Sequence, residues 1–175
     1  MDWYESVFEL IDMRSFSNLW FWIALAVLWS SVSHWVLGVP WDMVLRARKE
    51  GEGEAVEDLQ AMVRINVNRI LYIAGQSGLL ITGFACFALT MMAILGFFYR
   101  NEFAQALFLL GFPMSIVGLL SVATARKIRV EEPAGEALYK RLVKHRIITQ
   151  GIGMLSIFVT AIWGMLQNMT ASVLF

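Results

Sequence analysis

Two histidines are the residues of this chain whose type and placement are best suited to chemistry. His34 lies near the end of the first apolar stretch, and His145 lies just before the last one. Imidazoles on two facing helices can ligate a haem iron from both sides, so the pair is a candidate site for b-type haem. The other interpretation is that both are interfacial polar residues bonded to backbone or lipid headgroups. On that interpretation, which we prefer, no cofactor is expected.

Other patterns that carry chemistry are missing from the sequence. It has no glycine-rich phosphate loop, no HExxH motif and no spaced pair of carboxylates within an apolar stretch. The single cysteine, Cys86, cannot by itself complete a zinc or iron–sulfur site. We therefore expect no catalytic residue, no metal site and a protein that is not an enzyme.

Small and hydrogen-bonding residues form stripes within the apolar stretches. Because lipid gives helices no hydrophobic reason to associate, such residues mark the sides on which helices touch. A polar cavity or pathway is the alternative, but no acid or base lies at hydrocarbon depth, which disfavours a pump. The candidate packing or polar-face residues are Ser30, Ser33, Gln76, Gly83, Thr90, Thr149, Gly153, Ser156, Thr160, Gly164 and Gln167.

Four apolar stretches must position these residues. The second contains no Asp, Glu, Lys, Arg or His, and as a helix it would be about 45 Å long, whereas a hydrocarbon core needs about 30 Å. With 58% hydrophobic and 16% charged residues, the composition is that of a membrane protein. The sequence predicts an all-α polytopic membrane protein, one domain over residues 1–175, built as a four-transmembrane-helix bundle. The predicted spans are residues 18–38, 70–99, 103–125 and 147–167.

The segments outside the spans set the predicted orientation. Residues 3–13 place apolar and acidic side chains on different sides, which predicts an N-terminal interfacial amphipathic helix. Nearly all lysines and arginines lie in residues 39–69 and 126–146, so both loops are predicted to be cytoplasmic and both chain ends periplasmic. Fourteen basic residues balance fourteen acidic ones, and this balance argues against a nucleic-acid partner.

Three segments carry a resemblance to known proteins: MDWYESVFELIDMRSFSNLWFWIALAVLW, VRINVNRILYIAGQSG and QGIGMLSIFVTAIWGMLQN. They resemble a small alphaproteobacterial membrane-protein family that carries the label "component of SufBCD complex". The resemblance implies a bacterial inner membrane and an association with iron–sulfur cluster assembly. Since one thiol cannot hold a cluster, it implies proximity to that machinery and not cluster ligation by this chain.

Together these features predict a non-enzymatic accessory, assembly or scaffold subunit of a membrane complex. Its expected partners are the lipid bilayer and other membrane protein subunits or further copies of itself. One alternative is an electron-transfer protein with a b-type haem or quinone site that uses His34 and His145. A second alternative is a small transporter or channel formed by oligomerisation.

Overall fold

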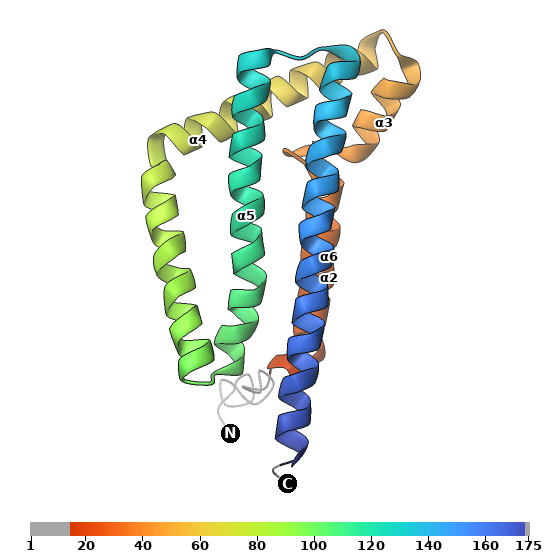
Figure 1. Ribbon diagram of the computed structural model, residues 1–175. Helices are drawn as coiled ribbons and strands as arrows, with labels where there is room; N and C mark the ends of the chain where they lie inside the picture. Colours follow the sequence, from red (N-terminus) through yellow and green to blue (C-terminus); the bar gives the residue numbers. More distant parts are fainter. Residues whose placement is uncertain (1–14, 174–175) are drawn as a thin grey trace, which may run out of the picture.

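The computed structural model describes residues 15–173, so the predicted amphipathic helix at residues 3–13 lies outside the described part. Over residues 15–173 the protein is all-α, with five α-helices and one short hairpin (Figure 1). The helical elements are the 3-10 turn η1 (Ser15–Ser17), α2 (Leu19–His34), α3 (Trp41–Glu50), α4 (Glu54–Ala93), the π-helix η2 (Ile94–Phe98), α5 (Glu102–Glu131) and α6 (Gly135–Val173). The hairpin pairs β1 (Trp35–Val36) with β2 (Val39–Pro40) in antiparallel register.

Helices α2, α5 and α6 form one packed unit. Leu25 and Trp29 of α2 are buried together with Val117 of α5, and Ile152 of α6 packs against them. A second small cluster joins Phe16 and its aromatic neighbours on α2 to α5 and α6. We call the part of the molecule in which the long helices lie side by side the stem. It comprises α2, residues 72–98, residues 102–125 and residues 147–173.

Helix α4 lies partly outside this unit because it bends. Figure 1 shows its first half lying across the ends of α5 and α6 before the helix turns and runs along α5. The buried residues of α4 all belong to the first half and recur every four residues: Ala55, Leu59, Val63 and Val67. This spacing gives one apolar side, as in an amphipathic helix. The second half packs one side on α5, at the edge of the stem.

The largest hydrophobic core lies at the end of the stem where α4 bends. We call this region the cap: residues 35–71 together with residues 126–146. Its core joins the hairpin, α3, the first half of α4 and the ends of α5 and α6. The fully or nearly fully buried members include Val39, Val44, Ala47, Leu59 and Leu142. The two segments that connect the predicted spans, residues 39–69 and 126–146, therefore form a folded layer.

The first helix ends earlier than the predicted span of residues 18–38. Helix α2 stops at His34, and the chain then makes a tight turn at Leu37 and Gly38, both with positive φ. Asn66 of α4 donates a hydrogen bond to the carbonyl oxygen of Gly38 at 3.2 Å, which holds the turn against the cap. Pro40 has no N–H to continue a helix, so a new helix begins after it.

Three helices of the described residues are long and apolar enough to cross a membrane: Glu54–Phe98, Glu102–Glu131 and Gly135–Met169. Helix α2 is apolar but shorter, with 16 residues. At a rise of about 1.5 Å per residue it is about 24 Å long, less than the usual hydrocarbon thickness of about 30 Å.

Candidate functional site

The predicted stripe on the fourth span is a buried face of α6. Thr149 and Thr160 are 2% and 0% exposed, and Ser156 is 8% exposed. A Cβ atom placed on Gly153 would lie 2.7 Å from Cε3 of Trp29, closer than real contacts allow. The missing side chain therefore makes room for an indole of α2.

A second glycine of α6, Gly164, also lies against aromatic side chains. A Cβ atom on Gly164 would lie 3.2 Å from Cζ2 of Trp22 and 3.3 Å from Cδ1 of Phe16. Gln167, at the end of the stripe, is half-buried. Glycines on α6 thus receive the large aromatic side chains of α2 and its preceding turn, and this lets the two helices approach closely.

The hydroxyls on the buried face of α6 have no hydrogen-bond partner among the described residues. The side-chain oxygens of Thr149, Ser156 and Thr160 are buried without a hydrogen-bond partner among the described residues, as is Nε1 of Trp29. A buried polar group without a partner costs about 1–3 kcal/mol of folding free energy. These side chains are therefore stabilised by a hydrogen-bonding ligand, or by rotation of the hydroxyl toward a backbone carbonyl oxygen of its own helix. They can donate and accept hydrogen bonds, but they carry no charge and cannot transfer a proton at neutral pH.

The serines predicted to face other helices from the first span lie elsewhere. The buried side of α2 carries Phe21, Leu25 and Trp29. Ser30 is exposed and Ser33 is half-buried, so the side of α2 that is buried within residues 15–173 is not the serine side, and the serine contact face stays a prediction. The physical reason is that indole and alkyl groups fill the space above the glycines of α6, which small hydroxyls cannot do.

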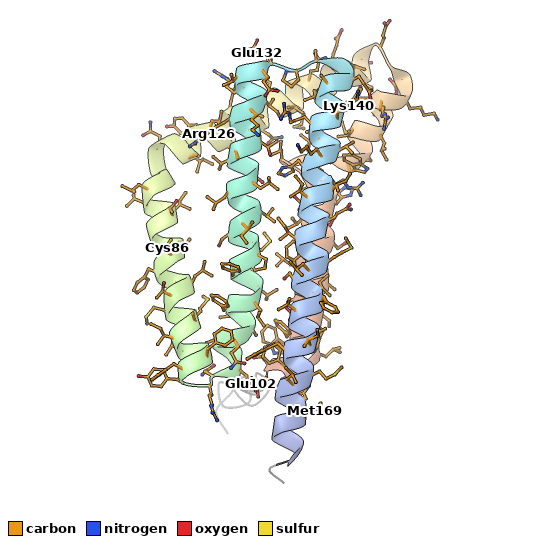
Figure 2. The ribbon with its side chains drawn as sticks, in the orientation of Figure 1. Cys86, Glu102, Arg126, Glu132, Lys140 and Met169 are labelled. Carbon is orange, nitrogen blue, oxygen red and sulfur yellow. The ribbon has the colours of Figure 1, made fainter. Side chains whose placement is uncertain are left out.

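The stripe predicted on the second span faces away from the rest of the chain. Gln76, Gly83 and Thr90 are all exposed, and a Cβ atom on Gly83 would meet nothing within 4 Å. The hydroxyl of Thr90 donates to the carbonyl oxygen of Cys86 in its own helix at 2.8 Å. Within residues 15–173 this stripe does not pack, because α4 is at the edge of the stem and packs its opposite side on α5. Its role as a packing face stays a prediction. Figure 2 shows the second half of α4, around Cys86, as the outermost helix of that edge.

The two histidines lie beside different groups. His145 is 4% exposed, and its Nδ1 lies 3.1 Å from Oγ1 of Thr124 on α5. His34 is largely exposed, with Nε2 at 3.7 Å from a carboxylate oxygen of Asp42 on α3. His145 keeps Nε2 for another ligand, whereas His34 would have to leave Asp42 to offer its own. The shared haem site therefore stays a prediction.

Arg146, beside His145, joins three helices, a role that no pattern in the sequence indicates. Its Nε donates to the carbonyl oxygen of Ser33 at 3.2 Å, and its guanidinium lies 4.2 Å from the ring centre of Trp41. Ser33 is in the last turn of α2, where carbonyl oxygens lack partners within the helix and favour positive charge. This contact ties α6 to the end of α2 and the start of α3.

A second polar bridge joins the other end of the stem. Gln105 of α5 is 3% exposed, donates to the carbonyl oxygen of Gly96 at 2.8 Å and accepts from Nε1 of Trp163 at 2.9 Å. Gly96 lies in the π-helix, and a Cβ atom there would lie 2.9 Å from the backbone nitrogen of Gln105. The sequence signal was available, because Gln105 is the only carboxamide in the third apolar stretch.

Comparison with known proteins adds no relative: no family model, no curated protein and no solved structure matches this chain. The fold by itself defines the class. The chain is an all-helical protein with helices long and apolar enough to cross a membrane, a buried small-residue face on α6 and an exposed one on α4.

Proposed function

We propose that this chain is an integral protein of a bacterial inner membrane that works as a non-enzymatic accessory, assembly or scaffold subunit. In this proposal α2, α4, α5 and α6 cross the membrane, the cap is cytoplasmic and both chain ends are periplasmic. Of the fourteen lysines and arginines, only Arg14 and Arg100 lie outside residues 39–69 and 126–146, and this asymmetry supports the orientation.

One observation supports the accessory role: the membrane-length part of α4 has a polar, small-residue face on which no other element of residues 15–173 packs. The most apolar 18-residue window of α4 is 0% buried, against 28% for the window of α6. Gln76 lies on this exposed face, and a carboxamide facing hydrocarbon has no hydrogen-bond partner. Gly83 leaves room for a neighbouring helix, and no described residue lies within 4 Å of a Cβ atom placed there.

The neighbour that fits this face is a transmembrane helix of another subunit. Such a helix could approach the backbone closely at Gly83 and exchange a hydrogen bond with the amide of Gln76. Since an amide both donates and accepts, a second copy of this chain is the competing occupant, and the test below separates the two.

The test is purification from the native membrane in mild detergent, followed by mass spectrometry and an absorbance spectrum. We expect one membrane protein to co-purify in fixed ratio with the wild type, and to be lost when Gly83→Leu fills the α4 face. Gly118→Leu is the matched control, because Gly118 is an exposed glycine on α5 whose added Cβ would also meet nothing within 4 Å.

Three outcomes would contradict the proposal. The first is the same co-purifying protein with both variants, and the second is a complex of this chain with itself only. The third is a haem absorption band that disappears in His34→Ala and His145→Ala, which would select the electron-transfer alternative.

Orientation has its own test. Replacing Cys86 with alanine removes the single thiol, and Glu54→Cys then places one in the exposed start of α4. We expect a membrane-impermeant maleimide to label this thiol in inside-out vesicles and not in intact spheroplasts. Labelling in spheroplasts would place the cap in the periplasm and overturn the proposed topology.

A further inference from the structure

A pocket of about 360 Å³ opens where the cap meets the stem, between α3 and the first turns of α6. Lys140, Lys144, Ile147 and Ile148 follow one another along its α6 wall, at the spacing that keeps residues on one side of a helix. The pocket therefore passes from cationic at the cap to apolar at the stem. Figure 2 shows Lys140 near the cap end of α6.

The charge of the pocket is incompletely balanced. Arg48 of α3, which also lines it, lies 4.0 Å from a carboxylate oxygen of Glu136. Lys140 and Lys144 have no ion-pair partner within residues 15–173, although they lie one helical turn apart and repel each other. An anionic group held between the two ammonium groups would remove that repulsion.

Tyr139 gives an independent indication of a ligand. This residue lines the same pocket, is only 6% exposed and has a buried hydroxyl without a hydrogen-bond partner among the described residues. A buried phenol favours a partner, and a negatively charged oxygen is a strong acceptor for its O–H. The pocket is thus lined by two ammonium groups without an ion-pair partner and by a tyrosine whose buried hydroxyl has no partner among the described residues.

The apolar end of the pocket indicates which anion is bound. Ile147 is 62% exposed and Ile148 is 38% exposed, and they continue the apolar outer side of α6 below the lysines. A phospholipid presents a phosphate at the interface and hydrocarbon beneath it, so it would use both ends of this pocket. A free phosphate would use only the cationic end.

We propose that this pocket binds the phosphate of an anionic phospholipid, with Lys140, Lys144 and the Tyr139 hydroxyl as donors and the isoleucines against its acyl chains. Basic pockets at the cytoplasmic ends of transmembrane helices are suited to such headgroups. The inference rests on the proposed membrane placement of the cap and not on the accessory role.

The test is native mass spectrometry of the purified full-length protein titrated with phosphatidylglycerol, and separately with phosphatidylcholine. We expect phosphatidylglycerol to bind more tightly than phosphatidylcholine, and Lys140→Gln/Lys144→Gln to weaken that binding by about thirtyfold. Lys49→Gln/Lys127→Gln is the matched control, because it removes the same charge from exposed positions of the cap outside the pocket. This control should keep wild-type binding.

Tyr139→Phe tests the hydroxyl while it keeps the ring in the core. We expect phosphatidylglycerol binding to fall by about tenfold. The melting temperature of the lipid-free protein should be no lower than that of the wild type, because the variant removes a buried hydroxyl without a partner. Equal weakening in the lysine control, or unchanged binding in both pocket variants, would overturn the proposal.

Inorganic phosphate separates the two sources of the anion. We expect millimolar phosphate alone to bind weakly and not to displace the lipid. If it binds as tightly as phosphatidylglycerol, the pocket is a site for a soluble phosphate and the lipid proposal is wrong. The α4 variant Gly83→Leu should bind lipid normally, so failure here is distinct from failure of the proposed accessory role.

Discussion

The buried face of α6 and the exposed face of α4 carry the same kinds of residue but differ in use. Both have glycine, threonine and glutamine at helical spacing within an apolar stretch. On α6, Gly153 receives the indole of Trp29, and Thr149 and Thr160 are almost fully buried. On α4, Gly83 meets nothing and Gln76 is exposed.

This difference shows that residue type does not say which helix a face will meet. Small residues permit close approach, but the approach needs a large partner side chain opposite them. Tryptophans of α2 lie against Gly153 and Gly164 of α6, whereas no described side chain lies against Gly83 of α4. Within residues 15–173 nothing packs on the α4 face at Gly83, and we propose above that a helix of another subunit does. Matched substitutions on the two sides can break or sharpen that interpretation.

The largest expected effect concerns the glycines. Gly153→Ala places a methyl group 2.7 Å from the Trp29 ring, so the helices must shift apart. We expect a loss of about 1–3 kcal/mol in the free energy of unfolding, measured by thermal denaturation in detergent. Gly83→Ala should cost nothing and can gain up to about 1 kcal/mol through helix propensity. Equal losses would mean that the α4 glycine is packed in the isolated chain.

The next largest effect concerns the glutamines. Gln105→Leu leaves the carbonyl oxygen of Gly96 and Nε1 of Trp163 without their bonds in a buried place. We expect unfolding to become easier by about 2 kcal/mol, since each unsatisfied buried group costs about 1–3 kcal/mol. Gln76→Leu should leave the stability of the isolated chain unchanged, because its amide has no bond within residues 15–173. Both are measured by the same detergent unfolding assay.

A stabilising effect of Gln105→Leu would contradict this account of the bridge. A destabilising effect of Gln76→Leu in the isolated chain would show that its amide is bonded internally. The two outcomes are independent, because the residues lie on different helices and share no bonded partner.

The helical class could be predicted from the sequence because long apolar stretches can satisfy their backbone groups only as helices in lipid. Three of the four stretches form helices long and apolar enough to cross a membrane. The end of the first helix could not be placed, since the apolar residues Val36, Leu37 and Val39 continue past His34. They are buried in the cap instead, and a local hydropathy pattern does not distinguish these two environments.

Which face of each helix meets which neighbour was the part that the sequence could not supply. A stripe on a helix marks a face, but the bend of α4 and its position at the edge of the stem depend on the cap core. The bridge at Gln105 was detectable as a lone carboxamide, whereas its partner in the π-helix was not. The contact between Thr124 and His145 likewise forms only if α5 and α6 place these residues at the same level along the stem. That alignment follows from the whole fold.

The smallest expected effect concerns the threonines. It tests whether the contact between Thr124 and His145 stabilises the end of the stem near the cap. Thr124→Val removes the partner of Nδ1 in the buried His145, so we expect a loss of about 1 kcal/mol in the free energy of unfolding. Thr90→Val removes an exposed hydroxyl that bonds only its own helix, so the change should stay within about 0.5 kcal/mol. Thermal denaturation in detergent measures both. A larger loss for Thr90→Val would reverse the comparison, because it would place the essential threonine contact on the α4 face.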